Sequence, residues 1–198
     1  MKKIFFCLAF TAVCFMASAQ NSVKLPPVDK SPMDMAYHPA NYPVLKIQDK
    51  ATEPLLARVI YSRPLKTGRT TFGELVEYNT VWRLGANEAT EVEFYRDVKI
   101  GGKKIPKGKY TLYAIASPTE WIMILNKDTD TWGAFKYNEK KDVLRTTVPV
   151  QKTDAPVEAF TMVFEKAPGG TNLVVAWDEV RVALPIQSAT TTGSTAAK

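Results

Sequence analysis

From Leu55 onward the chain alternates short apolar runs with turn residues, a pattern typical of β-strands. Over Glu91–Val98 the apolar side chains of Val92 and Phe94 fall on one face, and polar side chains fall on the other. Glu120–Asn126 is almost continuously apolar, which is typical of a strand buried on both faces. No long helical period interrupts these runs, so the pattern predicts a β-rich domain.

Turn residues divide the rest of this region into further strands. The clearest hairpin spans Val98–Ala116, with turns at Gly101-Gly102 and Pro106-Lys107-Gly108, and Pro168-Gly169-Gly170 marks another turn. Thr71 is expected to cap a short helical turn over Phe72–Tyr78. The other expected strands are Leu55–Tyr61, Asp142–Val150, Val157–Glu165, Thr171–Asp178 and Glu179–Ile186.

Strands of this length predict an all-β fold: an antiparallel β-sandwich, either jelly-roll-like or an open barrel, with at most one or two short helices. We expect the β-sandwich domain to span residues 55–186. Residues 187–198, rich in Ser, Thr and Ala, are expected to form a disordered tail.

Residues 20–54 form a distinct segment, because they contain six prolines, which favour an extended backbone. Apolar residues such as Met33 and Met35 are too frequent here for a free linker. We therefore expect an extended arm packed on the domain, able to add an edge strand. The arm carries the only histidine, His38, and a lone histidine makes no multi-histidine metal site. The sequence indicates no metal and no cofactor.

The first 19 residues have the parts of a secretory signal peptide: a basic start, an apolar run over Ile4–Met16, and the small-residue cleavage site Ala17-Ser18-Ala19. A lipoprotein anchor at Cys14 is the competing interpretation, but the bulky Val13 precedes it. Both cysteines lie in this segment, so the mature chain would hold no disulfide and no thiolate. We expect a secreted or periplasmic protein.

The net charge argues against a nucleic-acid partner. Cleavage leaves 24 basic and 20 acidic residues, so the formal charge falls from +6 to +4, and the basic residues are scattered. No later run reaches the roughly 18 apolar residues that a transmembrane helix needs. No transmembrane segment is therefore expected after signal cleavage.

A set of motifs gives the chain a likeness to a known family. The motifs are Tyr61-Ser62-Arg63-Pro64, Gly68-Arg69, Phe72-Gly73, Val81–Thr90, Pro106–Leu112, Trp132-Gly133 and Asp142–Arg145. Together they resemble the secreted domain-of-unknown-function family twenty-nine eleven, seen mainly in Bacteroidetes-type bacteria. The likeness covers most of Ser31–Ile186. It implies an exported β-rich domain and carries over no catalytic residue.

The stretch Val81–Thr90 is the densest candidate site, because it combines aromatic, guanidinium, amide and carboxylate side chains around a glycine. Arginine offers a planar fork of donors that suits carboxylate or phosphate, and it stacks on aromatic rings. Arginines beside turns and strand ends are expected to converge on one rim. The predicted ligand-binding residues are Arg63, Arg69, Trp82, Arg83, Asn87, Glu88 and Arg145, with Trp132, Tyr137 and Trp177 as further ring faces.

The same residues have a purely structural interpretation. Arg83 and Glu88 can form a buried ion pair that locks their loop onto the sheet. Removing one partner of such a pair typically costs ~3–5 kcal/mol. Both interpretations stay open on the sequence alone.

The evidence for catalysis is thinner. Glu88 is the one candidate acid/base, with Glu93 or Asp34 as the second carboxylate that glycoside hydrolysis requires. His38, Ser62 and Asp34 can be drawn as a triad without any supporting motif, since the G-x-S-x-G signature is missing.

A calcium loop over Asn126–Asp130 lacks the glycine and glutamate of an EF-hand, so a polar turn is expected there.

The leading hypothesis is a non-enzymatic binding or envelope-associated module with an Arg/Asn/Glu-lined polar site. Its partner would be a small molecule, a glycan or an envelope protein. The alternative is a hydrolase of a glycan or another envelope substrate, with Glu88 as acid/base and Arg83 positioning it. A third hypothesis is an interaction module whose sheet edge receives a partner strand.

Overall fold

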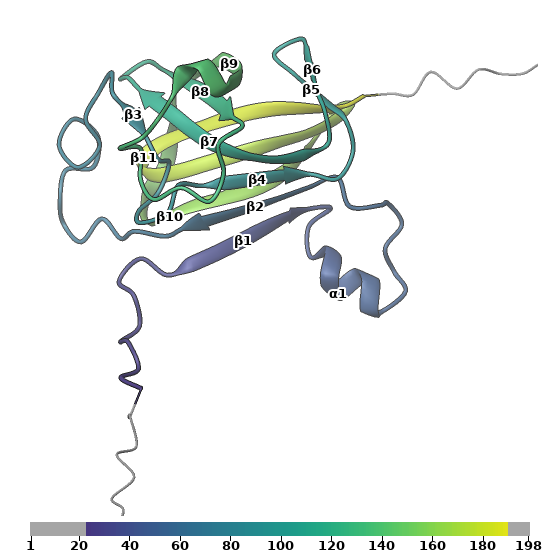
Figure 1. Cartoon of the computed structure of the whole chain (residues 1–198), viewed down its shortest axis with the longest axis horizontal. Coiled ribbons are helices and arrows are strands. Elements are labelled where there is room, and N and C mark those ends of the chain that lie inside the picture. The colour runs from purple at the N-terminus through teal and green to yellow at the C-terminus, as the bar shows by residue number, and fades with distance from the viewer. Residues whose placement is uncertain (1–22, 190–198) are drawn as a thin grey trace, which may run out of the picture.

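The structure is a computed structural model that describes residues 23–189, so the expected signal peptide lies outside the described residues. Within this range the strands form two antiparallel sheets that lie face to face (Figure 1). The fold is therefore an antiparallel β-sandwich and not a closed barrel, which confirms the predicted fold class. No helix in residues 23–189 is both long and apolar enough to cross a membrane.

The larger sheet has the strand order β1-β2-β4-β7-β8-β9, and β3 pairs with β7 beside this path. Its strands are β1 (Met33–His38), β2 (Ala57–Ser62), β3 (Val81–Trp82), β4 (Glu91–Phe94), β7 (Gly108–Ala116), β8 (Glu120–Asn126) and β9 (Asp142–Pro149). β8 has the predicted bounds, because its apolar run is closed by polar residues at both ends.

The smaller sheet has the order β10-β11-β5-β6. Its strands are β5 (Val98–Ile100), β6 (Lys103–Ile105), β10 (Gln151–Ala167) and β11 (Gly170–Ser188). Gly101 and Gly102 form the β5–β6 turn at φ values of 55° and 79°, as predicted. The next strand, β7, belongs to the other sheet, so Pro106-Lys107 connects the two layers and does not extend the hairpin.

The prediction of two separate strands, Thr171–Asp178 and Glu179–Ile186, is wrong, because β11 runs through both. Asp178 has a left-handed φ of 54°, and the pairing of β10 with β11 shifts register opposite this region. The polar pair Asp178-Glu179 therefore marks a bulge, which bends a strand without ending it.

The C-terminal boundary also differs from the expectation. Gln187 and Ser188 continue β11 and pair with Lys99 and Val98 of β5. Gln187 and Ser188 are therefore ordered, contrary to the expectation for residues 187–198, and residues 190–198 lie outside the described residues.

The inner faces of the two sheets make one hydrophobic core. Val92 and Phe94 of β4 are buried, as the alternation predicted. Phe160 and Met162 of β10 belong to the second layer of this core and are at most 1 % exposed. Aromatic rings fill one end of the core: Phe72, Trp82, Trp121, Phe160 and Trp177 contact one another at centroid distances of 5.2–6.3 Å.

The N-terminal arm supplies the outer strand of the larger sheet. β1 pairs antiparallel with β2, from Met33 opposite Ser62 to His38 opposite Ala57. Helix α1 (Tyr42–Ile47) follows, buries no residue and lies beside the sandwich (Figure 1). The segment expected to be an extended arm is therefore extended over β1 and helical over Tyr42–Ile47.

The expected helical turn over Phe72–Tyr78 is not formed, and this prediction is wrong. Phe72 and Val76 instead face each other in an isolated bridge. Gly73 between them has a left-handed φ of 94°, a conformation that right-handed helices exclude. The apolar residues of this segment still face the core in part, because Val76 is buried while Leu75 is 43 % exposed.

Replacing Phe160 by alanine should lower the free energy of unfolding by about 3–5 kcal/mol, because it removes a buried ring from the aromatic end of the core. Urea unfolding measures this loss. Val163→Ala on the same strand is the matched control, because Val163 is 42 % exposed and should change stability by less than about 1 kcal/mol. Similar losses in both variants would contradict the assignment of faces on β10.

Candidate functional site

The loop Arg83–Thr90, which follows β3, is held in an irregular conformation. Trp82 donates from Nε1 to the carbonyl oxygen of Gly85 at 3.1 Å. Thr90 donates from its hydroxyl to the carbonyl oxygen of Leu84 at 2.5 Å. Leu84 is fully buried at a left-handed φ of 56°, which costs a non-glycine residue about 1–2 kcal/mol. The loop is thus fixed at some energetic cost.

Arg83 lines a hollow of about 240 Å³ at the aromatic end of the sandwich. Its Nε atom is buried and has no hydrogen-bond partner among the described residues. No ion pair within residues 23–189 involves this side chain. A buried polar atom without a partner is unfavourable, and Arg58 Nε and Thr71 Oγ1 are the other buried side-chain atoms in this condition within residues 23–189.

Aromatic and small residues from distant parts of the chain form the walls of this hollow. Trp82 and Trp177 lie nearly parallel, with an interplanar angle of 17° and ring centroids 6.3 Å apart. Pro64, Leu75 and Ala86 contribute further apolar surface. The hollow therefore combines a guanidinium with flat apolar walls.

Arg69 lies on the same hollow, but its guanidinium is partly used by its own turn. Its Nε donates to the carbonyl oxygen of Lys66 at 2.9 Å, and Nη2 donates to that of Leu65 at 2.5 Å. The left-handed φ values of Thr67 and Gly68, 48° and 70°, make this wrapping possible. Arg69 is thereby held in place as a second cation at the hollow, with Nε and Nη2 already bonded to backbone carbonyl oxygens.

Asn87 and Glu88 do not line the hollow of Arg83. Asn87 donates from Nδ2 to Asp29 Oδ1 at 3.1 Å. Glu88 is exposed and lines a separate hollow of about 270 Å³ with Glu91 and Asp130. Within the described residues no ion pair joins Arg83 to Glu88, so the structure does not contain the expected clamp.

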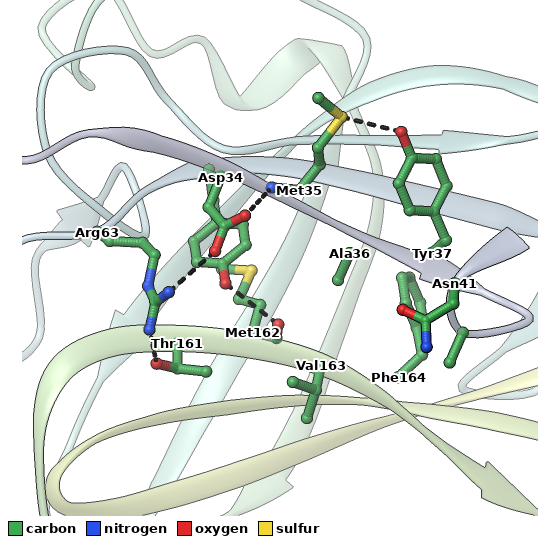
Figure 2. Close-up of a pocket in the computed structure, with 12 residues that line it drawn as sticks. Asp34, Met35, Ala36, Tyr37, Asn41, Arg63, Thr161, Met162, Val163 and Phe164 are labelled. Carbon is green, nitrogen blue, oxygen red and sulfur yellow. Dashed lines mark hydrogen bonds and ion pairs between the residues drawn. The ribbon is translucent and has the colours of Figure 1, made fainter. Parts of the chain in front are cut away.

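Arg63 joins the edges of the two sheets. Figure 2 shows its guanidinium between Asp34 of β1 and Thr161 of β10. Nη1 donates to Asp34 Oδ2 at 3.0 Å, Nη2 donates to Thr161 Oγ1 at 2.9 Å, and Nε donates to the carbonyl oxygen of Phe160 at 3.2 Å. These bonds use all three nitrogens, so the geometry of Arg63 is that of a structural clamp.

Arg145 belongs to a separate group of side chains on the outer face of the larger sheet. It donates from Nε to Asp142 Oδ2 at 2.8 Å and from Nη2 to the hydroxyl oxygen of Tyr137 at 2.6 Å. Tyr137 in turn donates to Asp142 Oδ2 at 2.6 Å. Burial, with the bond to Asp142 as a smaller cause, raises the pKa of Tyr137 to about 12. The three side chains fasten the β8–β9 connection to β9.

His38, Ser62 and Asp34 do not assemble into a triad. His38 and Ser62 lie at opposite ends of the β1–β2 pair. His38 packs against the ring of Phe164 at 6.1 Å, and burial lowers its pKa. Ser62 donates to the sulfur of Met33 at 3.1 Å, and Asp34 is bonded to Arg63. Each side chain therefore has a separate packing role.

The Asn126–Asp130 loop is a polar turn. Asp128 pairs with Lys141 at 2.8 Å, and Asp130 pairs with Lys109 at 2.7 Å. These lysines occupy the carboxylate oxygens that a calcium loop would direct at the ion.

The predicted residues thus fall into four places: the hollow of Arg69, Trp82 and Arg83, the hollow of Glu88, the Arg63 clamp and the Arg145 group. Ala86 lies within the candidate stretch Val81–Thr90, although it was not named as a lining residue. The sequence did not indicate Pro64 or Leu75 as lining residues, and the position of Pro64 next to Arg63 was the one available signal.

A family model described as "Protein of unknown function (DUF2911)" matches residues 45–186. The chain belongs to this family. The match confirms the resemblance indicated by the motifs and includes every lining residue of the Arg83 hollow except Ser31. Searches of curated proteins and of solved structures found no match to this DUF2911 protein.

Because Arg83 and Glu88 are not paired, Arg83→Met and Glu88→Gln should each change the free energy of unfolding by no more than about 0.5–1 kcal/mol. Arg83→Met removes an unsatisfied buried nitrogen and is expected to be neutral or stabilising. Urea unfolding of the single and double variants measures both effects and their coupling. A shared loss of ~3–5 kcal/mol would restore the buried-clamp interpretation.

The raised pKa of Tyr137 predicts a pH dependence of stability. Its neutral form is favoured in the folded state, so its contribution is complete below the ordinary tyrosine pKa of 10.0 and is lost as the pH rises towards about 12. The difference in unfolding free energy between wild type and Tyr137→Phe should therefore shrink over this range. Denaturant unfolding at pH 9, 10 and 11 tests it, and a difference that grows with pH would contradict the prediction.

Proposed function

We propose that this DUF2911 protein is a non-enzymatic binding module that takes an anionic group, a carboxylate or a phosphate, in the hollow of Arg83. The observation that carries the proposal is the buried Nε of Arg83, which lacks a partner within the described chain. Arginine presents several donors in one plane, so an incoming oxyanion can bond two of them at once.

The walls of the hollow support a small ligand with a flat or apolar part. Trp82 and Trp177 line the hollow beside the guanidinium, although Trp177 is only 3 % exposed. A volume of about 240 Å³ lies just below the usual range of ligand pockets, so it suits a terminal acidic group or one acidic sugar better than a large cofactor. Arg69 adds a second positive charge at the same hollow.

The proposal also includes the cellular location of the protein. The basic start, apolar run and small-residue cleavage site of residues 1–19 support export to the periplasm or the cell exterior. The ligand would then be an acidic molecule of the envelope or its surroundings. The hydrolase alternative has less support, because Glu88 lines a different hollow from the arginine that was expected to position it.

Thermal unfolding in the presence of acidic probes tests the proposal. The probes are inorganic phosphate, glucose 6-phosphate, glucuronate and succinate, each compared with sodium chloride at equal ionic strength. At ten times its Kd, a ligand stabilises the fold by about 1.4 kcal/mol, which raises the Tm by about 3–5 °C. We expect such a rise for at least one probe in the wild type and none in Arg83→Met.

Arg96→Met is the matched control, because Arg96 is half-buried, donates to the carbonyl oxygen of Pro54 and does not line the hollow. It should keep the full rise in Tm. An equal rise in wild type and Arg83→Met, or no rise with any probe, would refute the proposed site.

A further inference from the structure

A second surface stands out on the outer face of the larger sheet, where the β8–β9 connection (residues 127–141) covers part of β7 and β8. Ala134 and Tyr137 pack there on Tyr113 and Ile124. The neighbouring Trp132 and Phe135 do not take part in this packing, and they are 61 % and 81 % exposed. Two large exposed rings on one short segment are not explained by the stability of the fold.

The segment that carries these rings is firmly anchored. Gly133 donates from its backbone to the carbonyl oxygen of Asn87 at 3.0 Å, and Ala89 donates to that of Thr131 at 3.0 Å. Trp132 also faces Glu88 in a backbone bridge. The backbone that carries the rings is therefore hydrogen-bonded on both sides of Trp132, at Thr131 and at Gly133.

The ring of Phe135 lies close to the backbone of Gly133. Gly133 has a left-handed φ of 67°, and a Cβ atom at this position would lie 2.6 Å from the Phe135 ring. The ring thus rests directly on the glycine backbone, which no other residue allows.

The two rings border a hollow of about 410 Å³, which is within the usual size range of ligand sites. Tyr113 and Thr131 also line it, and Asp128, Asp130 and Lys136 add polar groups. The hollow that contains Glu88 adjoins it, because both are lined by Asp130 and Thr131. The two adjoining hollows, of about 270 Å³ and 410 Å³, together offer more space than either does alone.

The charges around the hollow favour a neutral ligand. Asp128 is paired with Lys141 at 2.8 Å, and Asp130 is paired with Lys109 at 2.7 Å. Lys109 also contacts Glu91 at 3.1 Å. A cage for a cation needs uncompensated negative charge beside its rings, whereas Asp128 and Asp130 each have a lysine partner and Lys136 adds a positive charge at the same hollow. They can still accept hydrogen bonds from hydroxyl groups.

We propose that the surface formed by Asp130, Trp132 and Phe135 binds a neutral oligosaccharide. The C–H faces of pyranose rings would lie on Trp132 and Phe135, whose ring faces carry partial negative charge. The sugar hydroxyls would donate to Asp128 and Asp130 and accept from Lys136. This site lies apart from the hollow of Arg83 and does not depend on the anionic ligand proposed for it.

Affinity electrophoresis of the mature protein in gels that contain hydroxyethyl cellulose, glycogen or mannan tests the proposal, together with titration of tryptophan fluorescence by chitohexaose. We expect at least one of these probes to bind. Trp132→Ala and Phe135→Ala should each weaken that binding by about tenfold or more, the effect of removing a central contact residue. Gly133→Ala should weaken it as well, because the added Cβ displaces the Phe135 ring.

Two control variants show whether a loss of binding is specific to these rings. Tyr95→Ala removes an aromatic residue that is 39 % exposed and follows the end of β4, and it should bind as the wild type does. Arg83→Met should also retain glycan binding, so failure of the anion site and failure of this site are distinguishable. Urea unfolding of each variant establishes that it is folded.

Three results would overturn the proposal. The first is no binding of any of the four probes by the wild type. The second is equal binding by the wild type and Trp132→Ala. The third is wild-type self-association in sedimentation experiments that Trp132→Ala abolishes, which would make the two rings an interface between copies of the chain.

Discussion

Contacts between aromatic rings hold the two sheets together at one end of the sandwich. The rings come from both sheets and from the segment between β2 and β3: Phe72, Trp82, Trp121, Phe160 and Trp177. Trp82 of the larger sheet meets Phe160 of the smaller sheet edge to face at 5.4 Å, and Phe72 packs on Trp121 at 5.2 Å. Trp82 is also the last residue of β3, so the loop that carries Arg83 starts from this cluster.

The same cluster explains how Arg83 can remain without a protein partner. Trp82 is fixed by the rings around it and by its bond to Gly85, so the backbone beside Arg83 has little freedom to reach an acceptor. Arg63 differs in this respect, because all three of its nitrogens are bonded across the two sheet edges. Arginines that look alike in the sequence thus differ: Arg63 is bonded through all three nitrogens, whereas Arg83 Nε has no partner among the described residues.

Local patterns predicted the sandwich and most of its strands, because alternation and turn chemistry act over a few residues, as in β4 and β8. The prediction for β11 was wrong because a bulge at Asp178 and a strand end have similar sequences. The site was predicted only in part. Left-handed φ values at Leu84, Gly85 and Asn87 turn the loop so that Arg83 and Glu88 line different hollows. Sequence spacing carries no signal for such turns.

The proposed function requires that the Nε–H of Arg83 is buried, ordered and free to donate to an oxyanion. Proton–nitrogen NMR of the arginine Nε–H groups tests this requirement, with Arg83→Lys used to assign the signal. We expect a single Arg83 signal, protected from exchange with water, that moves when one of the acidic probes is added. A signal that exchanges rapidly, or a protected signal that no probe moves, would contradict the proposal, because Arg83 would then be solvated or already bonded within the protein.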